Sequence, residues 1–282
     1  MKAAPNVVTL NLVNNRLIPN AMEPRASIGE YNPGTGDYKL TTTSQNPHLT
    51  RLLVAAFVLG IPENKLAVVA PAVGGGFGSK IYHYGEEALV LAAAQTLGRP
   101  VRWTAERSES VLTDAHGRDH VTKIELGCTK DGQILAIRTE TLANVGAYLS
   151  NFSTATPTFL HGTLMAGPYK VPHVYVNVKT VFTNTAPVDA YRGAGRPEAT
   201  YSLERVIDKM CRELGLDPFE VRRKNLLTPD QFPYTTPVGL VYDTGNYPAT
   251  LDKAMAMADV AGFGKRAAES KACLLSTSDA TD

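Results

Sequence analysis

The sequence predicts an α+β fold, in which helices and strands alternate without a regular strand–helix–strand rhythm. Two observations carry this prediction. Several segments show the apolar spacing of amphipathic helices, whereas others are runs of β-branched residues bounded by turn signals. The chain has 282 residues and is 44% hydrophobic, which is enough for a sizeable core in one or two domains.

Four segments are predicted to be helical. In the first, NPHLTRLLVAAFVLGIP, Pro47 suits the first turn, leucines and alanines form one apolar face, and Gly60 and Pro62 end the helix. A later segment opens with Asp217 and Glu220 in a capping-box pattern. The four segments cover residues 46–62, 86–100, 197–215 and 217–227.

Three stretches are predicted to form strands. The run NVVTLNLVNN at residues 6–15 is rich in β-branched and apolar residues, and LAVVA at 66–70 has the composition of a short buried strand. Residues 121–142 predict two strands joined at Asp131-Gly132, a strong hairpin signal.

Composition excludes several classes of protein. A net charge of +1 gives no basic or acidic excess for nucleic acid or a membrane surface, and no apolar run reaches the length of a spanning helix. No signal peptide is recognisable at the amino terminus. The isolated cysteines Cys128, Cys211 and Cys273 form no CxxC pair, which disfavours zinc, iron–sulfur and disulfide sites in this chain. A cytoplasmic location is the expectation.

A glycine-rich loop, Gly74–Gly78, follows the strand at 66–70 and admits three interpretations. A nucleoside triphosphate loop fails, because Ser79 separates the last glycine from Lys80. A dinucleotide fingerprint is off by one position. The third is a tight turn with positive φ. Four glycines in five residues favour a loop that brings bare N–H groups to an anionic or oxo-bearing ligand, with Phe77 either as a wall of that site or in the core.

Two other loops also precede predicted helices. TTTSQNPH places Gln45 where its amide can reach a ligand oxygen, although an exposed loop glutamine would look the same. DAYRGAGRPEA places Arg192 and Arg196 around a Gly-Ala-Gly turn, which is either an anion site or a surface capping loop. Three such loops together suggest one convergent pocket.

At these residues the sequence resembles a known family. TSQNPH, VVAPAVGGGFGSK, GRPVRW, KDGQILAI and TNTAPVDAYRGAGRPEA occur in order, from about residue 5 to residue 272. Together they resemble the large, molybdopterin-binding subunit of the xanthine dehydrogenase, aldehyde oxidase and carbon monoxide dehydrogenase family. The likeness is greatest to the bacterial carbon monoxide dehydrogenase-like branch.

The resemblance implies the cofactor and its contacts. Molybdopterin, in the cytosine dinucleotide or a related form, holds molybdenum through a dithiolene, so the protein supplies no metal ligand. Gln45 would hydrogen-bond an oxo ligand, the residues Gly75, Gly76, Phe77 and Gly78 would lie against the molybdenum and pterin, and Arg192 and Gly193 would flank the metal. Molybdenum-bound hydroxide would attack the substrate carbon as hydride passes to a sulfido ligand. Electrons would leave through an iron–sulfur small subunit with [2Fe–2S] clusters and a medium subunit with FAD, in a dimer of heterotrimers.

Three departures from the family pattern narrow the range of expected substrates. Gly193 stands where carbon monoxide dehydrogenases carry the cysteine of a molybdenum–copper centre, which argues against carbon monoxide oxidation. Ile81 and Leu160 stand at or near the glutamate and arginine of purine-oxidising members. An aldehyde or an N-heterocycle is therefore the expected substrate.

We expect the chain to be a fragment with three parts: a first molybdopterin-binding domain at 1–228, truncated at its amino terminus, the start of a second at 229–272, and a non-native tail at 273–282. The family's general-base glutamate is expected beyond the chain, because Glu269 lies in a polar helix end. The fragment alone is expected to be inactive, and a non-catalytic remnant that binds cofactor or partner subunits is the alternative. A phosphate-binding ATPase is a third alternative.

Overall fold

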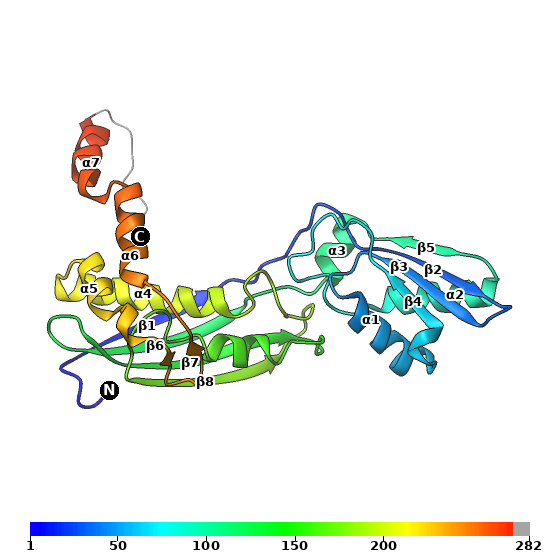
Figure 1. The fold of residues 1–282 in the computed structure, drawn as a ribbon, viewed down its shortest axis with the longest axis horizontal. Helices are drawn as coiled ribbons and strands as arrows, with labels where there is room; N and C mark the ends of the chain where they lie inside the picture. The colour runs from blue at the N-terminus through cyan, green and yellow to red at the C-terminus, as the bar shows by residue number, and fades with distance from the viewer. Residues whose placement is uncertain (273–282) are drawn as a thin grey trace.

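The computed structural model describes residues 1–272, so the predicted tail at 273–282 lies outside it. Figure 1 shows two lobes joined by extended segments, with the amino terminus at the far end of the larger lobe. Each lobe contains a four-stranded sheet. The chain leaves the larger lobe after its first strand, builds the smaller lobe with the next four strands, and returns at the sixth.

The sheet of the larger lobe has the order β1-β6-β7-β8. β1 pairs antiparallel with β6 and β6 with β7, whereas β7 and β8 are parallel. The strands are β1 (Asn6–Asn14), β6 (His120–Cys128), β7 (Ile134–Gly146) and β8 (His173–Phe182). The predicted strand at 6–15 and the predicted hairpin at Asp131-Gly132 are therefore confirmed.

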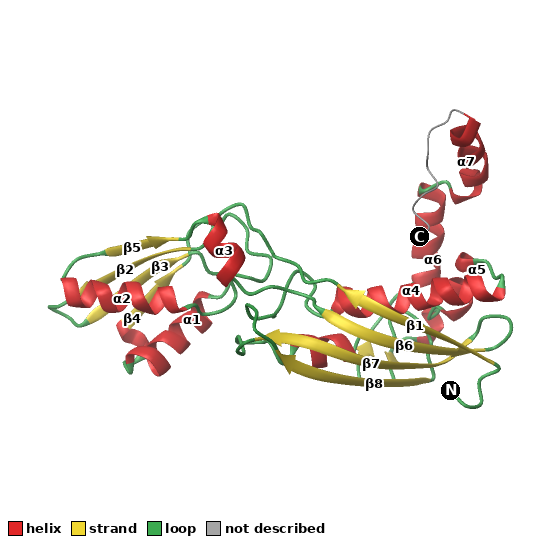
Figure 2. Ribbon diagram, turned by 180° about the vertical axis from the view of Figure 1, so that it is seen from behind, coloured by secondary structure: helices red, strands yellow, loops and turns green. Residues whose placement is uncertain are grey.

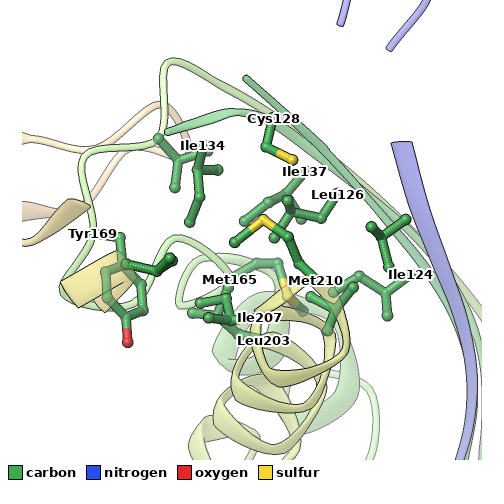
Figure 3. Close-up of a cluster of buried hydrophobic side chains, with 14 of the residues drawn as sticks. Ile124, Leu126, Cys128, Ile134, Ile137, Met165, Tyr169, Leu203, Ile207 and Met210 are labelled. Atoms are coloured by element: carbon green, nitrogen blue, oxygen red, sulfur yellow. The ribbon is translucent and has the colours of Figure 1, made fainter. Parts of the chain in front are cut away.

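Helix α4 (Arg196–Leu214) packs on β1 and β6 and closes the core of the larger lobe. Its buried residues, which include Leu203, Ile207 and Met210, face Ile124 and Leu126 of β6 (Figure 3). This helix has a strongly apolar stripe, and Gly215 ends it in a left-handed conformation, as its sequence predicts.

The sheet of the smaller lobe has the order β4-β3-β2-β5. β3 is parallel to β4 and antiparallel to β2, which is antiparallel to β5. Helix α2 packs against this sheet (Figure 2). The elements are β2 (Ala26–Asn32), β3 (Asp37–Thr42), β4 (Leu66–Val69), α2 (Gly85–Leu97) and β5 (Val101–Thr104).

In this lobe one prediction is wrong and another is confirmed with one difference. The strand at 66–70 was expected to be buried, but β4 lies at the sheet edge, where Leu66 is buried and Val69 is 43% exposed. The helix predicted over 46–62 begins as α1 (Pro47–Leu53) and continues as a π-helical segment, η1 (Val54–Leu59), before Gly60 ends it. An apolar run without alternation cannot by itself distinguish an edge strand from a buried one.

The remaining elements are shorter. In α5 (Pro218–Asn225), the Asp217 side chain accepts hydrogen bonds from the Phe219 and Glu220 amides, as its cap pattern predicts. Figure 1 shows α6 and α7 projecting away from α4 and α5. The others are α3 (Arg107–Thr113), β9 (Tyr234–Thr235), β10 (Val241–Tyr242), α6 (Tyr247–Met257), α7 (Phe263–Ala272) and the short helices η2 (Glu63–Lys65), η3 (Thr156–Leu160), η4 (Pro229–Gln231) and η5 (Val260–Gly262).

In α7, Glu269 pairs only loosely with Lys265, at 3.9 Å. Among residues 1–272, no helix combines the length and apolar character needed to cross a membrane. The predicted domain boundary at residue 228, just before η4, stays a prediction.

Candidate functional site

The glycine-rich loop closes around the side chain of Gln45. Gln45 Oε1 accepts hydrogen bonds from the amides of Gly78, at 3.0 Å, and Lys80, at 3.3 Å. The backbone amide of Gln45 in turn donates to the Lys80 carbonyl at 2.8 Å. Two of the three loops predicted to converge are thus joined directly, although Gln45 is 33 residues from Gly78 in the sequence.

Close approach explains why glycine stands at two positions of this loop. A Cβ on Gly76 would lie 2.2 Å from Gln45 Oε1, which would displace the carboxamide. Gly78 has φ of 111°, and a Cβ there would lie 2.2 Å from the carbonyl oxygen of Ala190. The glycines therefore admit the Gln45 side chain on one side and the backbone of a distant segment on the other.

Phe77 lies between these glycines in a left-handed conformation, with φ of 52°. This conformation is uncommon for a bulky residue and marks a backbone that its surroundings hold in place. Phe77 is 43% exposed, so it is not a core residue. Phe77 was expected either to form a wall of the site or to lie in the core. Its exposure fits the first interpretation and rules out the second.

A buried lysine anchors the other end of the loop. Lys80 Nζ donates to the Glu23 carbonyl at 2.8 Å and to its carboxylate at 3.0 Å. Glu23 Oε2 also accepts from the Gly74 amide at 2.7 Å. Burial alone would raise the pKa of the Glu23 carboxyl, but Gly74 and Lys80 stabilise its charged form, and the pKa lies below its ordinary value. Lys80 is thus committed to an internal ion pair, which disfavours the ATPase alternative.

The third loop joins the first two through its backbone. The Arg192 amide donates to the Phe77 carbonyl at 2.9 Å, and the Ala194 amide donates to the Tyr191 carbonyl at 2.7 Å. Arg192 and Gly193 are exposed, and Gly193 has φ of 99°. Arg196 begins α4 and donates to the Gly193 carbonyl at 3.3 Å. The structure therefore brings Gln45, the glycine loop and Arg192–Gly193 together.

These loops leave several hydrogen-bond donors available. Within residues 1–272, the amides of Gly76, Phe77 and Gly193 and the carboxamide nitrogen of Gln45 have no hydrogen-bond partner. Gly76 is buried, and a buried backbone donor is rarely left unpaired in a folded protein. An oxygen-rich ligand would satisfy donors of this kind without needing side-chain bulk.

Sequence reasoning missed the residues that support the third loop from behind. Arg118 is 8% exposed, and its guanidinium donates to the carbonyls of Tyr191 and Arg192, both at 3.0 Å. It also contacts Glu198 Oε1 at 3.4 Å. Arg118 is 80 residues from Glu198, and a lone arginine before a strand gives no sequence signal of such a contact.

Two buried histidines lie beside this group. His120 and His161 are 3% and 0% exposed, and their rings meet edge to face with centroids 5.1 Å apart. Burial lowers the pKa of His120 to about 3 and that of His161 to about 4. Both imidazoles are therefore neutral at neutral pH. No group of three histidine, cysteine, aspartate or glutamate side chains within residues 1–272 is arranged to hold a metal ion.

The two positions on which the sequence-based substrate prediction rests, Ile81 and Leu160, lie next to these loops. Ile81 is half-buried against the small cluster of Tyr82, Ala115 and Ala190. Leu160 ends η3, and its backbone lies 2.7 Å from the position that a Cβ on Gly195 would take. Both positions carry apolar rather than charged side chains.

The chain matches a family model and several known proteins. The model of the molybdopterin cofactor-binding domain family matches residues 1–226. The carbon monoxide dehydrogenase large chain of Hydrogenophaga pseudoflava is 38% identical over 91% of this chain and 32% of its own length. The gamma subunit of the 6-hydroxypseudooxynicotine dehydrogenase complex of Paenarthrobacter nicotinovorans is 34% identical, over 95% of this chain and 34% of its own.

A solved structure shares the fold closely. Quinoline 2-oxidoreductase from Pseudomonas putida 86 superposes with a TM-score of 0.92 and 34% identity, over 96% of this chain and 34% of its own. The chain thus spans about a third of the length of each of these three proteins.

Proposed function

Because this chain belongs to the molybdopterin cofactor-binding domain family, we propose that its three converging loops hold the molybdenum end of the cofactor in an oxidoreductase large subunit. The observation that carries the proposal is the Gln45 carboxamide. Its oxygen is fixed by the Gly78 and Lys80 amides, so its nitrogen, which has no partner within residues 1–272, is turned outward as a donor. A donor held in this way is suited to an oxygen ligand of the metal.

Each loop has a separate part in holding the cofactor. The amides of Gly76, Phe77 and Gly193 would donate to oxygen atoms of the bound group, while the exposed Phe77 ring would shield one side from water. Glycine at position 76 leaves room for the Gln45 carboxamide, and glycine at position 193 leaves room for Pro197, so the loops can keep the positions that their amides need. When bound, molybdopterin would supply the redox chemistry that oxidises a substrate carbon. The cytosine dinucleotide form is part of the proposal.

For the substrate we propose an N-heterocycle or an aldehyde. Gly193 offers no thiolate for a copper ion, and Ile81 and Leu160 offer neither a carboxylate nor a guanidinium to a purine. Two of the similar proteins are named for quinoline and for a hydroxylated nicotine derivative, which are heterocyclic compounds. Carbon monoxide and purines are therefore disfavoured.

We also propose partner subunits, since similar chains are named as the large chain of carbon monoxide dehydrogenase and as one subunit of a dehydrogenase complex. An iron–sulfur subunit and an FAD subunit would remove the electrons, in a dimer of heterotrimers. The expected cytoplasmic location remains a prediction from the cysteine pattern.

The test is Gln45→Glu in the full-length large subunit, expressed with its partner subunits. Glutamate keeps the oxygen that accepts from Gly78 and Lys80 but replaces the outward donor with an acceptor. We expect molybdenum content, measured by mass spectrometry of the metal, to fall about 10- to 100-fold. Gln95→Glu, on α2, is the matched control and should retain the metal.

Wild-type protein should also release a pterin and cytidine monophosphate on acid treatment, and should oxidise quinoline or benzaldehyde faster than xanthine or carbon monoxide. Wild-type protein without molybdenum would overturn the proposal and favour the non-catalytic remnant. Release of a different nucleotide would overturn only the cytosine form.

A further inference from the structure

Residues 115–119 lie behind the third loop, residues 189–199, which is called the Arg192 loop below, and backbone hydrogen bonds hold them there. Gly117 exchanges two backbone hydrogen bonds with Leu17, at 2.8 and 3.0 Å. The His116 amide donates to the Pro187 carbonyl at 2.9 Å. The segment is thus fixed on one side by the amino-terminal chain and on the other by the chain that leads into the Arg192 loop.

The backbone of this segment is strained where it turns. Arg118 and Asp119 both have left-handed φ values, of 63° and 71°. Consecutive left-handed residues without glycine are costly and persist only where the surroundings hold them. Arg16 contributes by pairing with Asp119 at 2.8 Å, and a Cβ on Gly117 would lie only 2.2 Å from Tyr191 Cβ. The left-handed turn at Arg118 and Asp119 directs the Arg118 side chain to the carbonyl groups of the Arg192 loop.

The Arg118 guanidinium there clamps two consecutive peptide groups. Nη1 donates to the Tyr191 carbonyl and Nη2 to the Arg192 carbonyl, each at 3.0 Å. The guanidinium lies over the Tyr191 ring at 4.8 Å, and Glu198 accepts from Nη1 at 3.4 Å. A planar guanidinium can hold two carbonyls in one fixed relation, which an ammonium cannot do.

Peptide planarity carries this clamp to the front of the loop. In a trans peptide the N–H points away from the C=O of the same unit. Arg118 holds the Tyr191 carbonyl, and the amide of that peptide, on Arg192, donates to Phe77. Arg118 also holds the Arg192 carbonyl, so the amide of that second peptide, on Gly193, faces away from Arg118.

We propose that Arg118 is a positioning residue that aims the Gly193 amide at the bound cofactor, with Glu198 orienting the guanidinium. The role of the amide rests on the proposed function, whereas the clamp itself is a property of this chain. Arg118 touches neither cofactor nor substrate, and it acts only through the two peptides that it holds.

The test is hydrogen–deuterium exchange on cofactor-free full chain, comparing wild type, Arg118→Met, Arg118→Lys and the exposed control Arg138→Met. In Arg118→Met, the amides of Arg192, Ala194 and Arg196 should exchange at least about tenfold faster, because both carbonyl clamps are lost. Arg118→Lys keeps the charge but offers a single donor group. It should therefore give a smaller increase in exchange rate at the same amides. Exchange in β6 and β7 should stay as in wild type.

Unchanged exchange in the loop would overturn the proposal, and so would an equal increase throughout the larger lobe, which would make Arg118 a general structural residue. If Arg118→Met fails to fold, Arg118→Lys decides on the same criterion. In cofactor-loaded enzyme, Arg118→Lys should keep its molybdenum but shift the Mo(V) electron paramagnetic resonance signal. An unshifted signal would overturn the aiming role. A wild type without molybdenum would refute the proposed function and leave the exchange result on the clamp standing.

Discussion

The two lobes and the junction between them are stabilised in different ways. Within residues 1–272, the core of the larger lobe contains 18 buried apolar residues, whereas that of the smaller lobe contains seven. At the junction between the lobes lies a smaller cluster of three buried apolar residues, Tyr82, Ala115 and Ala190. The junction is therefore not a continuation of either core, although it carries the candidate cofactor site.

Hydrogen bonds from charged and phenolic side chains replace apolar burial at the junction. Arg25 binds both Asp114, at 2.6 Å, and Glu86, at 3.0 Å, and it stacks on the Tyr84 ring. Tyr82 donates to the Ala190 carbonyl at 2.9 Å. Such bonds are directional, so they can fix loop backbones at defined positions where apolar contacts would allow sliding. The apolar cores of the lobes thus provide stability, whereas the polar bonds of the junction fix the geometry of the loops.

Cavities in the two cores should produce the largest effects and show whether the lobes unfold separately. Leu203→Ala in the larger core and Leu91→Ala in the smaller core each remove a side chain that is at most 1% exposed. Each should lower the free energy of unfolding by about 2–5 kcal/mol, because apolar contacts are lost and a cavity remains. Native-state hydrogen exchange should show the Leu91→Ala loss in β2, β3 and α2 while β6 and β7 stay protected.

Leu89→Ala is the matched control, since Leu89 lies on the same helix but is 66% exposed. It should change the unfolding free energy little. If Leu91→Ala opened both sheets equally, the lobes would be one cooperative unit, and the contrast between lobes and junction would lose its force.

At the junction itself, two glycines show whether a close backbone approach fixes the Arg192 loop. Gly78→Ala and Gly239→Ala both place alanine at positive φ, with strain of about 1–3 kcal/mol. Only Gly78 lies against another backbone, because nothing lies within 4 Å of the Cβ position on Gly239. Gly78→Ala should therefore release the protection of the Arg192 amide, while Gly239→Ala should not. Equal protection in the two variants would show that the close approach to Ala190 is unimportant.

The sequence predicted the elements that follow from local pattern. Helix α4, helix α2 and the β6–β7 hairpin have apolar periodicity, glycine stops or a strong turn signal, and each was confirmed. The exposure of β4 could not be predicted, because strand order depends on which neighbours the sheet acquires. Burial on an edge is a tertiary property.

The candidate site divides along the same line. Gln45, Gly76, Gly78 and Arg192 were identifiable because glycine density and family motifs mark them. Their cofactor-binding role remains a proposal. Arg118 had no such mark, since its importance comes from hydrogen bonds to residues more than 70 positions away in the sequence. Sequence shows which loops are unusual, whereas the supports behind them emerge only once the chain is folded.

The smallest expected effect is the response to pH of the buried histidines beside the Arg118 clamp. Folding lowers the pKa of His161 from 6.5 to about 4. Between these two pH values the unfolded chain therefore binds a proton that the folded chain does not bind. Stability from this group is complete above pH 6.5 and falls as the pH drops toward 4. Between pH 7 and 5.5 the loss should be about 1 kcal/mol per histidine.

Urea unfolding of wild type and His161→Leu at pH 7 and 5.5 measures this difference. Burial raises the pKa of the neighbouring Glu198, and its opposite contribution is present in both proteins. The difference between the two proteins in how far the unfolding free energy falls from pH 7 to pH 5.5 therefore reports on the histidine. The variant should lose about 1 kcal/mol less than wild type over this range. An equal loss of unfolding free energy in the two proteins would mean that His161 is hydrated or protonated in the folded protein. The polar groups behind the Arg192 loop would then be open to solvent.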